Sequence, residues 1–286
     1  MEEKKNNVLT QMQEETSEEH GEEVNKEIVG GKAEEQDTAG FFLISEELSE
    51  NNPPDTRKSG PQLLIEERPF WKIWQFFVII VILFFLQLGL RYIFPAGQDI
   101  EYVVVGIICQ LFLFAGVPIF LCHHYDQPLQ KLGIKNVESD FAVITGIKWG
   151  IGLYFLGIIA SILINLIYPM KQEIPDLVKM LLETGTLPFK IFIAISLMVF
   201  APIGEELLFR GFLFGALRKR FSVKWAVIIS GAIFGGMHFS IQGFPALFIG
   251  GMGFALLYNK YGNILINMIA HCAWNSVVVL LAFLVL

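Results

Sequence analysis

The chain has 286 residues, of which 53% are hydrophobic and only 17% are charged, and it contains 26 phenylalanines. Average soluble proteins carry about 25% charged residues, so this composition excludes an ordinary soluble domain and favours a membrane protein. The net charge of −7 is uneven, because residues 1–68 hold 18 of the 28 acidic and 7 of the 21 basic residues. The remainder is mildly basic and has no pattern typical of nucleic-acid binding.

Residues 1–69 are rich in Glu, Asn, Gln, Ser and Lys. Such a segment buries too little apolar surface to offset the entropy lost on ordering. We therefore predict a disordered acidic tail over 1–69, located in the cytoplasm.

The hydrophobic segments follow in chain order. A bilayer core of about 30 Å needs about 20 apolar residues in a helix. Four segments satisfy this length: 73–94, 102–122, 142–168 and 262–286. Two more, 225–239 and 244–258, are shorter and rich in glycine. The segment 188–220 is apolar but is interrupted by charged residues. We predict an all-α, polytopic bundle of about seven to eight spans. Residues 70–139 would form the N-terminal spans and 140–286 the core, with a short interfacial helix near 174–184.

The segment 188–220 is predicted to be one kinked helix rather than two short ones. Lys and Arg near span ends concentrate on the cytoplasmic side. A single helix places the cluster Arg218-Lys219-Arg220 on the same side as Lys131 and Lys135. It also places Glu205 about 20 Å from the cytoplasmic end, close to the bilayer midplane.

Charged residues inside this segment are candidates for chemistry, since ionisable groups within spans are costly and usually functional. Glu206 and Arg210 are four residues apart, so they share a helix face and can pair. Glu205 points about 100° away and stays available for other work. If both acids only neutralised Arg210, the cluster would be purely structural.

Two later spans add polar residues at a similar depth. Phe234 precedes His238 by four residues, and His271 precedes Asn275 by four, which places each pair on one helix face. This set suffices for peptide hydrolysis. Glu205 as general base, with His238 as its partner, can activate a water, and His271 with Asn275 can donate hydrogen bonds to the oxyanion.

The ordered set Glu205-Glu206-xxx-Arg210, Phe234-xxx-His238 and His271-xxx-Asn275 resembles the intramembrane endopeptidases related to the CAAX prenyl protease. That family includes the bacterial Abi proteins implicated in bacteriocin self-immunity. The resemblance covers roughly residues 140–286. It implies a helical bundle with a catalytic cavity inside the membrane, a peptide or protein substrate in or at the bilayer, and a location in the bacterial plasma membrane. It also implies catalytic roles for Glu205, His238, His271 and Asn275, with Glu206, Arg210 and Phe234 as supporting residues.

Three alternatives stay open from the sequence. We favour a mechanism without a cofactor, but Glu205, His238 and His271 also offer a carboxylate and two imidazoles to zinc. The sequence does not choose between prenylated and unmodified peptide substrates. A non-enzymatic membrane protein, such as a bacteriocin immunity protein or a scaffold, would use the same polar cluster structurally. An enzyme requires that Glu205, His238 and His271 surround one cavity.

Overall fold

The computed structural model describes residues 70–94, 100–169, 176–183 and 186–285. Over these residues the secondary structure is helical and contains no strand, which confirms the predicted all-α class. The predicted tail, residues 1–69, lies outside the described residues.

Among the described residues, five helices are long and apolar enough to cross a membrane. They are α3 (Ile73–Ile93), the continuous helix formed by α4 (Ile100–Leu111), η1 (Phe112–Gly116) and α5 (Val117–His124), α6 (Ser139–Ile167), the continuous helix Leu187–Leu217, and α13 (Ile264–Val285). Two further helices, α11 (Val223–Gly236) and α12 (Phe244–Tyr261), correspond to the shorter glycine-rich segments. The short helix expected near 174–184 is α7 (Asp176–Glu183), and a 3₁₀ turn, η2 (Leu129–Leu132), follows α5.

The helix Leu187–Leu217 is continuous, which confirms one helix through this segment. It alternates between α and π geometry, as α8 (Leu187–Ile195), η3 (Ser196–Phe200), α9 (Ala201–Glu206), η4 (Leu207–Phe214) and α10 (Gly215–Leu217). π segments are rare and are frequently found at functional sites. Here they flank the two glutamates on both sides.

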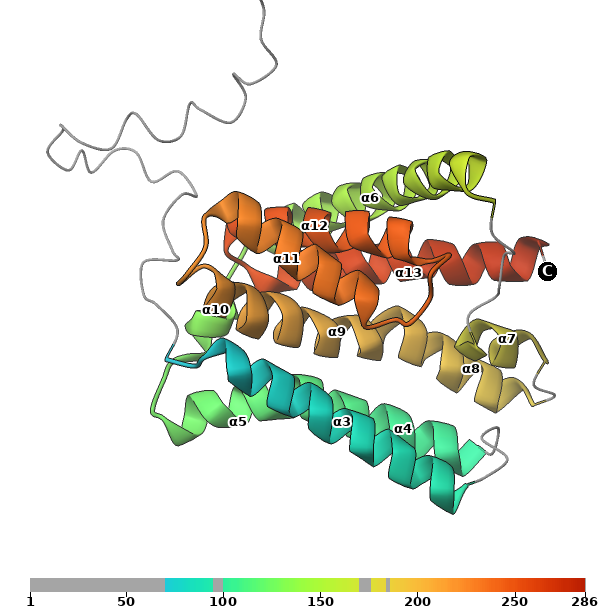
Figure 1. Ribbon diagram of the computed structural model, residues 1–286, viewed down its shortest axis with the longest axis horizontal. Helices are drawn as coiled ribbons and strands as arrows, with labels where there is room; N and C mark the ends of the chain where they lie inside the picture. Colours follow the sequence, from blue (N-terminus) through green and yellow to red (C-terminus); the bar gives the residue numbers. More distant parts are fainter. Residues whose placement is uncertain (1–69, 95–99, 170–175, 184–185, 286) are drawn as a thin grey trace, which may run out of the picture. The chain divides into compact units, whose positions relative to one another are not determined.

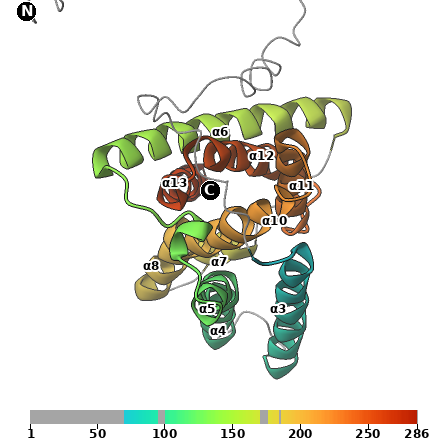
Figure 2. The same cartoon turned by 90° about the vertical axis from the view of Figure 1, so that its left-hand side faces the viewer.

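This long helix lies in the middle of the bundle, between α3, α4 and α5 on one side and α6, α11, α12 and α13 on the other (Figures 1 and 2). Every residue of its π segment η4 is buried. Trp71 fixes the start of α3 to it, because the indole Nε1 donates to the Phe212 carbonyl at 2.8 Å and the two rings stack. The helix that carries the glutamates is therefore the central element of the core.

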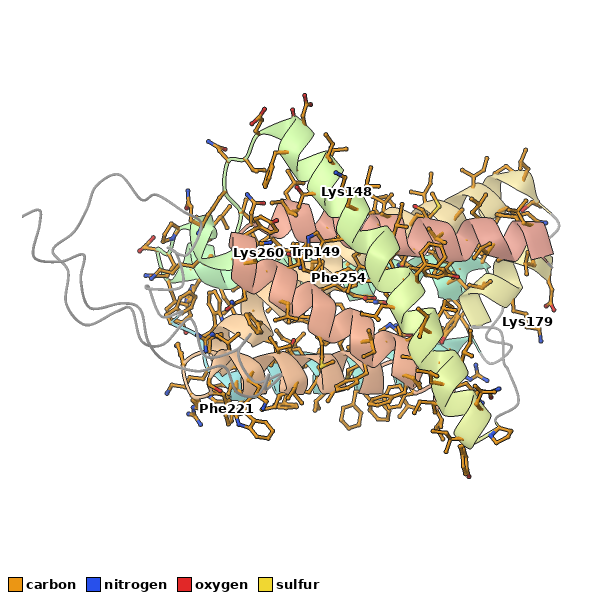
Figure 3. All side chains as sticks on the ribbon, turned by 90° about the horizontal axis from the view of Figure 1, so that it is seen from above. Lys148, Trp149, Lys179, Phe221, Phe254 and Lys260 are labelled. Atoms are coloured by element: carbon orange, nitrogen blue, oxygen red, sulfur yellow. The ribbon has the colours of Figure 1, made fainter. Side chains whose placement is uncertain are left out.

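Small residues allow close helix contacts where the sequence contains glycine pairs. Helix α6 crosses α12 and α13 (Figure 3). Its Gly150 lies against the backbone of Ala270 in α13, and Gly231 of α11 lies against Met252 of α12. A side chain at either glycine would collide with the neighbouring helix, so these positions set the helix spacing.

The basic residues of three turns gather at one end of the bundle. The Lys219 ammonium donates to the Trp71 carbonyl at the start of α3, and the Asn263 amide donates to the Lys135 carbonyl. Lys260 lies in the last turn of α12, next to Asn263 in the chain. One helix over Leu187–Leu217 thus brings the basic clusters to the same end, as predicted. The side of the membrane on which this end lies stays a prediction.

Candidate active site

The buried centre of the site is the ion pair predicted between Glu206 and Arg210. The Arg210 Nη1 atom lies 2.8 Å from Glu206 Oε1, and both side chains are 0% exposed. Glu206 also accepts hydrogen bonds from the Asn267 amide, at 3.2 Å, and from His271 Nδ1, at 2.8 Å. A buried carboxylate with three donors from two helices is fully engaged inside the protein.

Aromatic rings enclose the guanidinium of Arg210. Its central carbon lies 4.6 Å from the ring centroid of Phe234 and 5.1 Å from that of Phe254. Its Nη2 atom donates to the Gly251 carbonyl of α12 at 3.2 Å. The ring faces stabilise a cation held away from water. The supporting role expected for Phe234 stays a prediction.

His271 is held by Glu206 and by an aromatic ring. The carboxylate is an acceptor, so the Nδ1 atom of His271 carries the hydrogen of their 2.8 Å bond. Phe254 stacks on the imidazole with ring centroids 4.8 Å apart. The second ring nitrogen, Nε2, is then directed toward Glu205, whose Oε2 atom lies 3.8 Å away.

Glu205 differs from its neighbour in its surroundings. Its side chain is 12% exposed, whereas that of Glu206 is 0% exposed. Glu205, His238, His271 and Asn275 all line one cavity of about 1080 Å³. The structure therefore meets the geometric requirement stated for an enzyme, that the carboxylate and both imidazoles surround a common cavity.

His238 reaches the cavity from the C-terminal end of α11. Its Nδ1 atom lies 2.8 Å from the Phe234 carbonyl, which is an acceptor, so Nδ1 donates and Nε2 is left for the cavity. Between the described side chains of His238 and Glu205 there is no direct hydrogen bond, and the imidazole within 4 Å of Glu205 is that of His271. The predicted partnership of His238 with Glu205 stays a prediction.

Asn275 is anchored to the π segment that precedes the glutamates. In the π segment the Ala201 N–H donates to the Ser196 carbonyl five residues earlier. If the same spacing continued, the Leu197 carbonyl would accept from the N–H of residue 202. Residue 202 is proline and has no N–H. The Asn275 amide supplies the missing donor at 2.8 Å. An amide NH₂ has two hydrogens, so one remains for the cavity.

Sequence reasoning missed Asn267 and Phe254. Asn267 donates to Glu206 and, at 2.8 Å, to the Phe254 carbonyl, which ties α12 and α13 to the long helix. A signal for Asn267 was present, because Asn267, His271 and Asn275 recur every four residues and form one polar stripe on α13. Phe254 carries no such signal, since it is one of many apolar residues in α12.

The arrangement of Glu205, His238 and His271 can be compared with the ligand set that zinc requires. Among the residues that the structure describes, no three His, Cys, Asp or Glu side chains are arranged to hold a metal ion. Nδ1 of His271 is taken by Glu206, and Nδ1 of His238 by a backbone carbonyl. Both imidazoles keep Nε2 for the cavity, which is also how metal-bound histidines are held, so a mechanism without a cofactor stays a prediction and we derive no chemical step through a metal.

Comparisons with known proteins match part of the chain to one family. Residues 187–277 match the Rce1-like family of type II CAAX prenyl endopeptidases. This range, hereafter the Rce1-like segment, contains all four predicted catalytic residues. The resemblance inferred from the three motifs is therefore confirmed over 187–277.

Two curated bacterial proteins are similar to the chain. The putative membrane peptidase YdiL of Bacillus subtilis (strain 168) is 26% identical over 159 residues, which are 54% of this chain and 64% of that protein. The membrane-embedded CAAX protease MroQ of Staphylococcus aureus (strain USA300) is 26% identical over 196 residues, 66% of this chain and 78% of that protein. No solved structure matches the chain. With the five membrane-length helices, these similarities support an integral membrane protein.

Proposed function

We propose that the chain is an intramembrane endopeptidase of the bacterial plasma membrane that hydrolyses membrane-associated peptides. One observation carries the proposal: Glu205 faces a cavity shared with His238, His271 and Asn275, while the adjacent Glu206 is locked in a buried ion pair. A purely structural cluster would have no need of a second glutamate on the cavity wall. The match of the Rce1-like segment and the names of both relatives support a membrane peptidase in general.

In the proposed reaction Glu205 is the general base. Its carboxylate takes a proton from a water in the cavity, and the oxygen of that water bonds to the carbonyl carbon of the scissile peptide. The Nε2 atom of neutral His238 accepts the second hydrogen of the water and orients it. When the tetrahedral intermediate collapses, the C–N bond breaks and Glu205 returns its proton to the leaving amine.

The oxyanion is stabilised from α13. The Glu206 carboxylate holds Nδ1 of His271, and Nε2 donates to the oxyanion, which requires a hydrogen on both ring nitrogens. Asn275 donates the amide hydrogen that the Leu197 carbonyl leaves free. Both donors are already held in place, His271 by its hydrogen bond to Glu206 and Asn275 by its hydrogen bond to the Leu197 carbonyl. Little reorganisation is therefore needed when negative charge develops on the oxyanion.

The substrate is proposed to be apolar or lipidated at the cleaved end. The cavity is lined mainly by aliphatic and aromatic side chains, including Phe84 of α3, Phe114 of η1 and Ile158 of α6. Such a lining favours an apolar peptide, and a CAAX ending with its two aliphatic residues has this chemistry. Prenylation is a feature to be tested with matched substrates.

The test uses the full chain in lipid nanodiscs and a fluorogenic peptide with a CAAX ending, in farnesylated and unmodified forms. We expect wild-type protein to cleave at least one form and Glu205→Gln to lose at least about 100-fold in kcat, as for the loss of a general base. Glu138→Gln is the control, because Glu138 is exposed at the start of α6 and makes no capping bond. Absence of cleavage by wild-type protein, together with equal function of wild-type and Glu205→Gln proteins in a bacteriocin-immunity assay, would favour the non-enzymatic class.

A further inference from the structure

Two glutamines lie inside membrane-spanning helices on the wall of the catalytic cavity. Gln87 belongs to α3 and Gln110 to α4, and each is surrounded in sequence by apolar residues. Both line the same cavity as Glu205. Within the described part of the chain neither amide has a hydrogen-bond partner. An amide without a partner is costly in a bilayer, and polar residues in spans often mark the path of a substrate.

The Gln87 amide lies against the helix that carries Gln110. A methyl group at Gly106 of α4 would lie 3.6 Å from both Oε1 and Nε2 of Gln87, so the Gln87 amide lies against Gly106. Gln110 follows Gly106 by four residues and therefore shares its helix face, about 6 Å farther along the helix.

The residues that follow Gln110 contact the helix that carries Glu205. Leu111, next to Gln110, and Phe114 of η1 pack on Gly204, the residue before Glu205. The absence of a side chain at Gly204 brings η1 close to the helix that carries Glu205. The cavity wall thus runs from Gln87 past Gln110 to the Glu205 carboxylate.

The chemistry of the pair indicates its ligand. Each uncharged amide side chain both donates and accepts, as a peptide bond does. In an extended peptide, groups with the same orientation recur every two residues, about 6.6 Å apart. This spacing is close to the rise of about 6 Å from Gly106, where the Gln87 amide lies, to Gln110. An anion would leave the two amide carbonyls without a donor, a cation would leave the NH₂ groups without an acceptor, and a purely apolar ligand would satisfy neither.

We propose that Gln87 and Gln110 bind the main chain of an extended peptide and align it for attack at Glu205. This inference rests on the proposed endopeptidase function and deepens it, because it assigns the two N-terminal helices a part in binding the substrate. The glutamines are positioning residues and take no part in proton transfer.

Kinetics of Gln87→Leu, Gln110→Leu and the double variant test the proposal with the CAAX-ending peptide. We expect each single change to raise KM about 10-fold, the loss of one neutral hydrogen bond, with kcat changed less than about 2-fold. Ile108→Leu is the control, since Ile108 belongs to the same helix but is exposed and does not line the cavity. An unchanged KM, or a fall in kcat at constant KM as for a blocked water path, would overturn the proposal.

Backbone-methylated peptide separates recognition from a general effect on folding. Methylation of the peptide nitrogens removes the N–H groups that donate hydrogen bonds to the glutamine carbonyls. It should therefore weaken binding of the peptide to the inactive Glu205→Gln protein about 10-fold. The same methylation should have little effect on binding to protein that also carries both leucine substitutions. If wild-type protein cleaves no peptide, this binding measurement still decides the inference: methylation-sensitive, glutamine-dependent binding supports it, and equal binding by all variants rejects it.

Discussion

The carboxylate of Glu206 binds the Nδ1 atom of His271 at 2.8 Å and thereby turns Nε2 toward Glu205, 3.8 Å away. Two adjacent glutamates thus act on one imidazole from opposite sides. Glu206 is enclosed by protein, and Glu205 borders the cavity. We therefore expect the two glutamates to have separable roles, with Glu206 orienting His271 and stabilising the fold and Glu205 available for chemistry.

Substitution at Glu206 is expected to destabilise the protein. In Glu206→Gln the Arg210 guanidinium would be buried without a counter-charge, and breaking a buried ion pair costs about 3–5 kcal/mol. We expect a clear fall in the thermal unfolding temperature measured in detergent. Glu205→Gln should remain close to wild type in stability and be inactive. A stable, inactive Glu206→Gln beside an active Glu205→Gln would show that the roles are reversed.

Substitution at Asn275 tests whether its amide serves the reaction as well as the helix. Asn275→Ala removes a proposed oxyanion donor, so kcat should fall on the order of 100-fold. It also leaves the Leu197 carbonyl without its donor. Combining it with Pro202→Ala supplies a backbone N–H for that carbonyl. The double variant should regain stability and stay inactive; recovery of activity would assign Asn275 a structural role only.

The sequence was sufficient to predict the helices and the Glu206–Arg210 pair, because both follow from spacing along one helix. The common cavity also followed, since His238 and His271 lie at the depth of Glu205. The π segments and the contact between Asn275 and Leu197 did not follow, because they depend on the hydrogen-bond register of one helix and the approach of another. Phe254 was missed for a related reason: stacking on His271 requires α12 and α13 to be placed in space.

The topology can be tested by cysteine labelling in cells. Asn136 and Lys224 are exposed at the end of the bundle where the basic residues gather, and Lys179 lies in α7 near the start of α8. Because basic ends are cytoplasmic, cysteines at 136 and 224 should be protected from a membrane-impermeant reagent in intact cells, while one at 179 should react. Ser49, outside the described residues, should behave like 136 if the tail is cytoplasmic. Labelling of 136 and 224 from opposite sides would contradict the single helix Leu187–Leu217.

Metal dependence separates the two mechanisms that the sequence leaves open. Zinc needs at least three firm ligands, and the candidates are Glu205, His238 and His271. In the structure Nδ1 of His271 donates a hydrogen bond to Glu206, and Nε2 lies on the side of Glu205, where we propose that the oxyanion forms. We therefore expect purified protein to cleave the CAAX-ending peptide without stoichiometric metal and to keep its kcat after prolonged treatment with a strong chelator. His271→Ala should lose activity without a change in metal content. Elemental analysis that finds one zinc per active chain, lost in His271→Ala and required for recovery after chelation, would replace the metal-free mechanism with a zinc-dependent one.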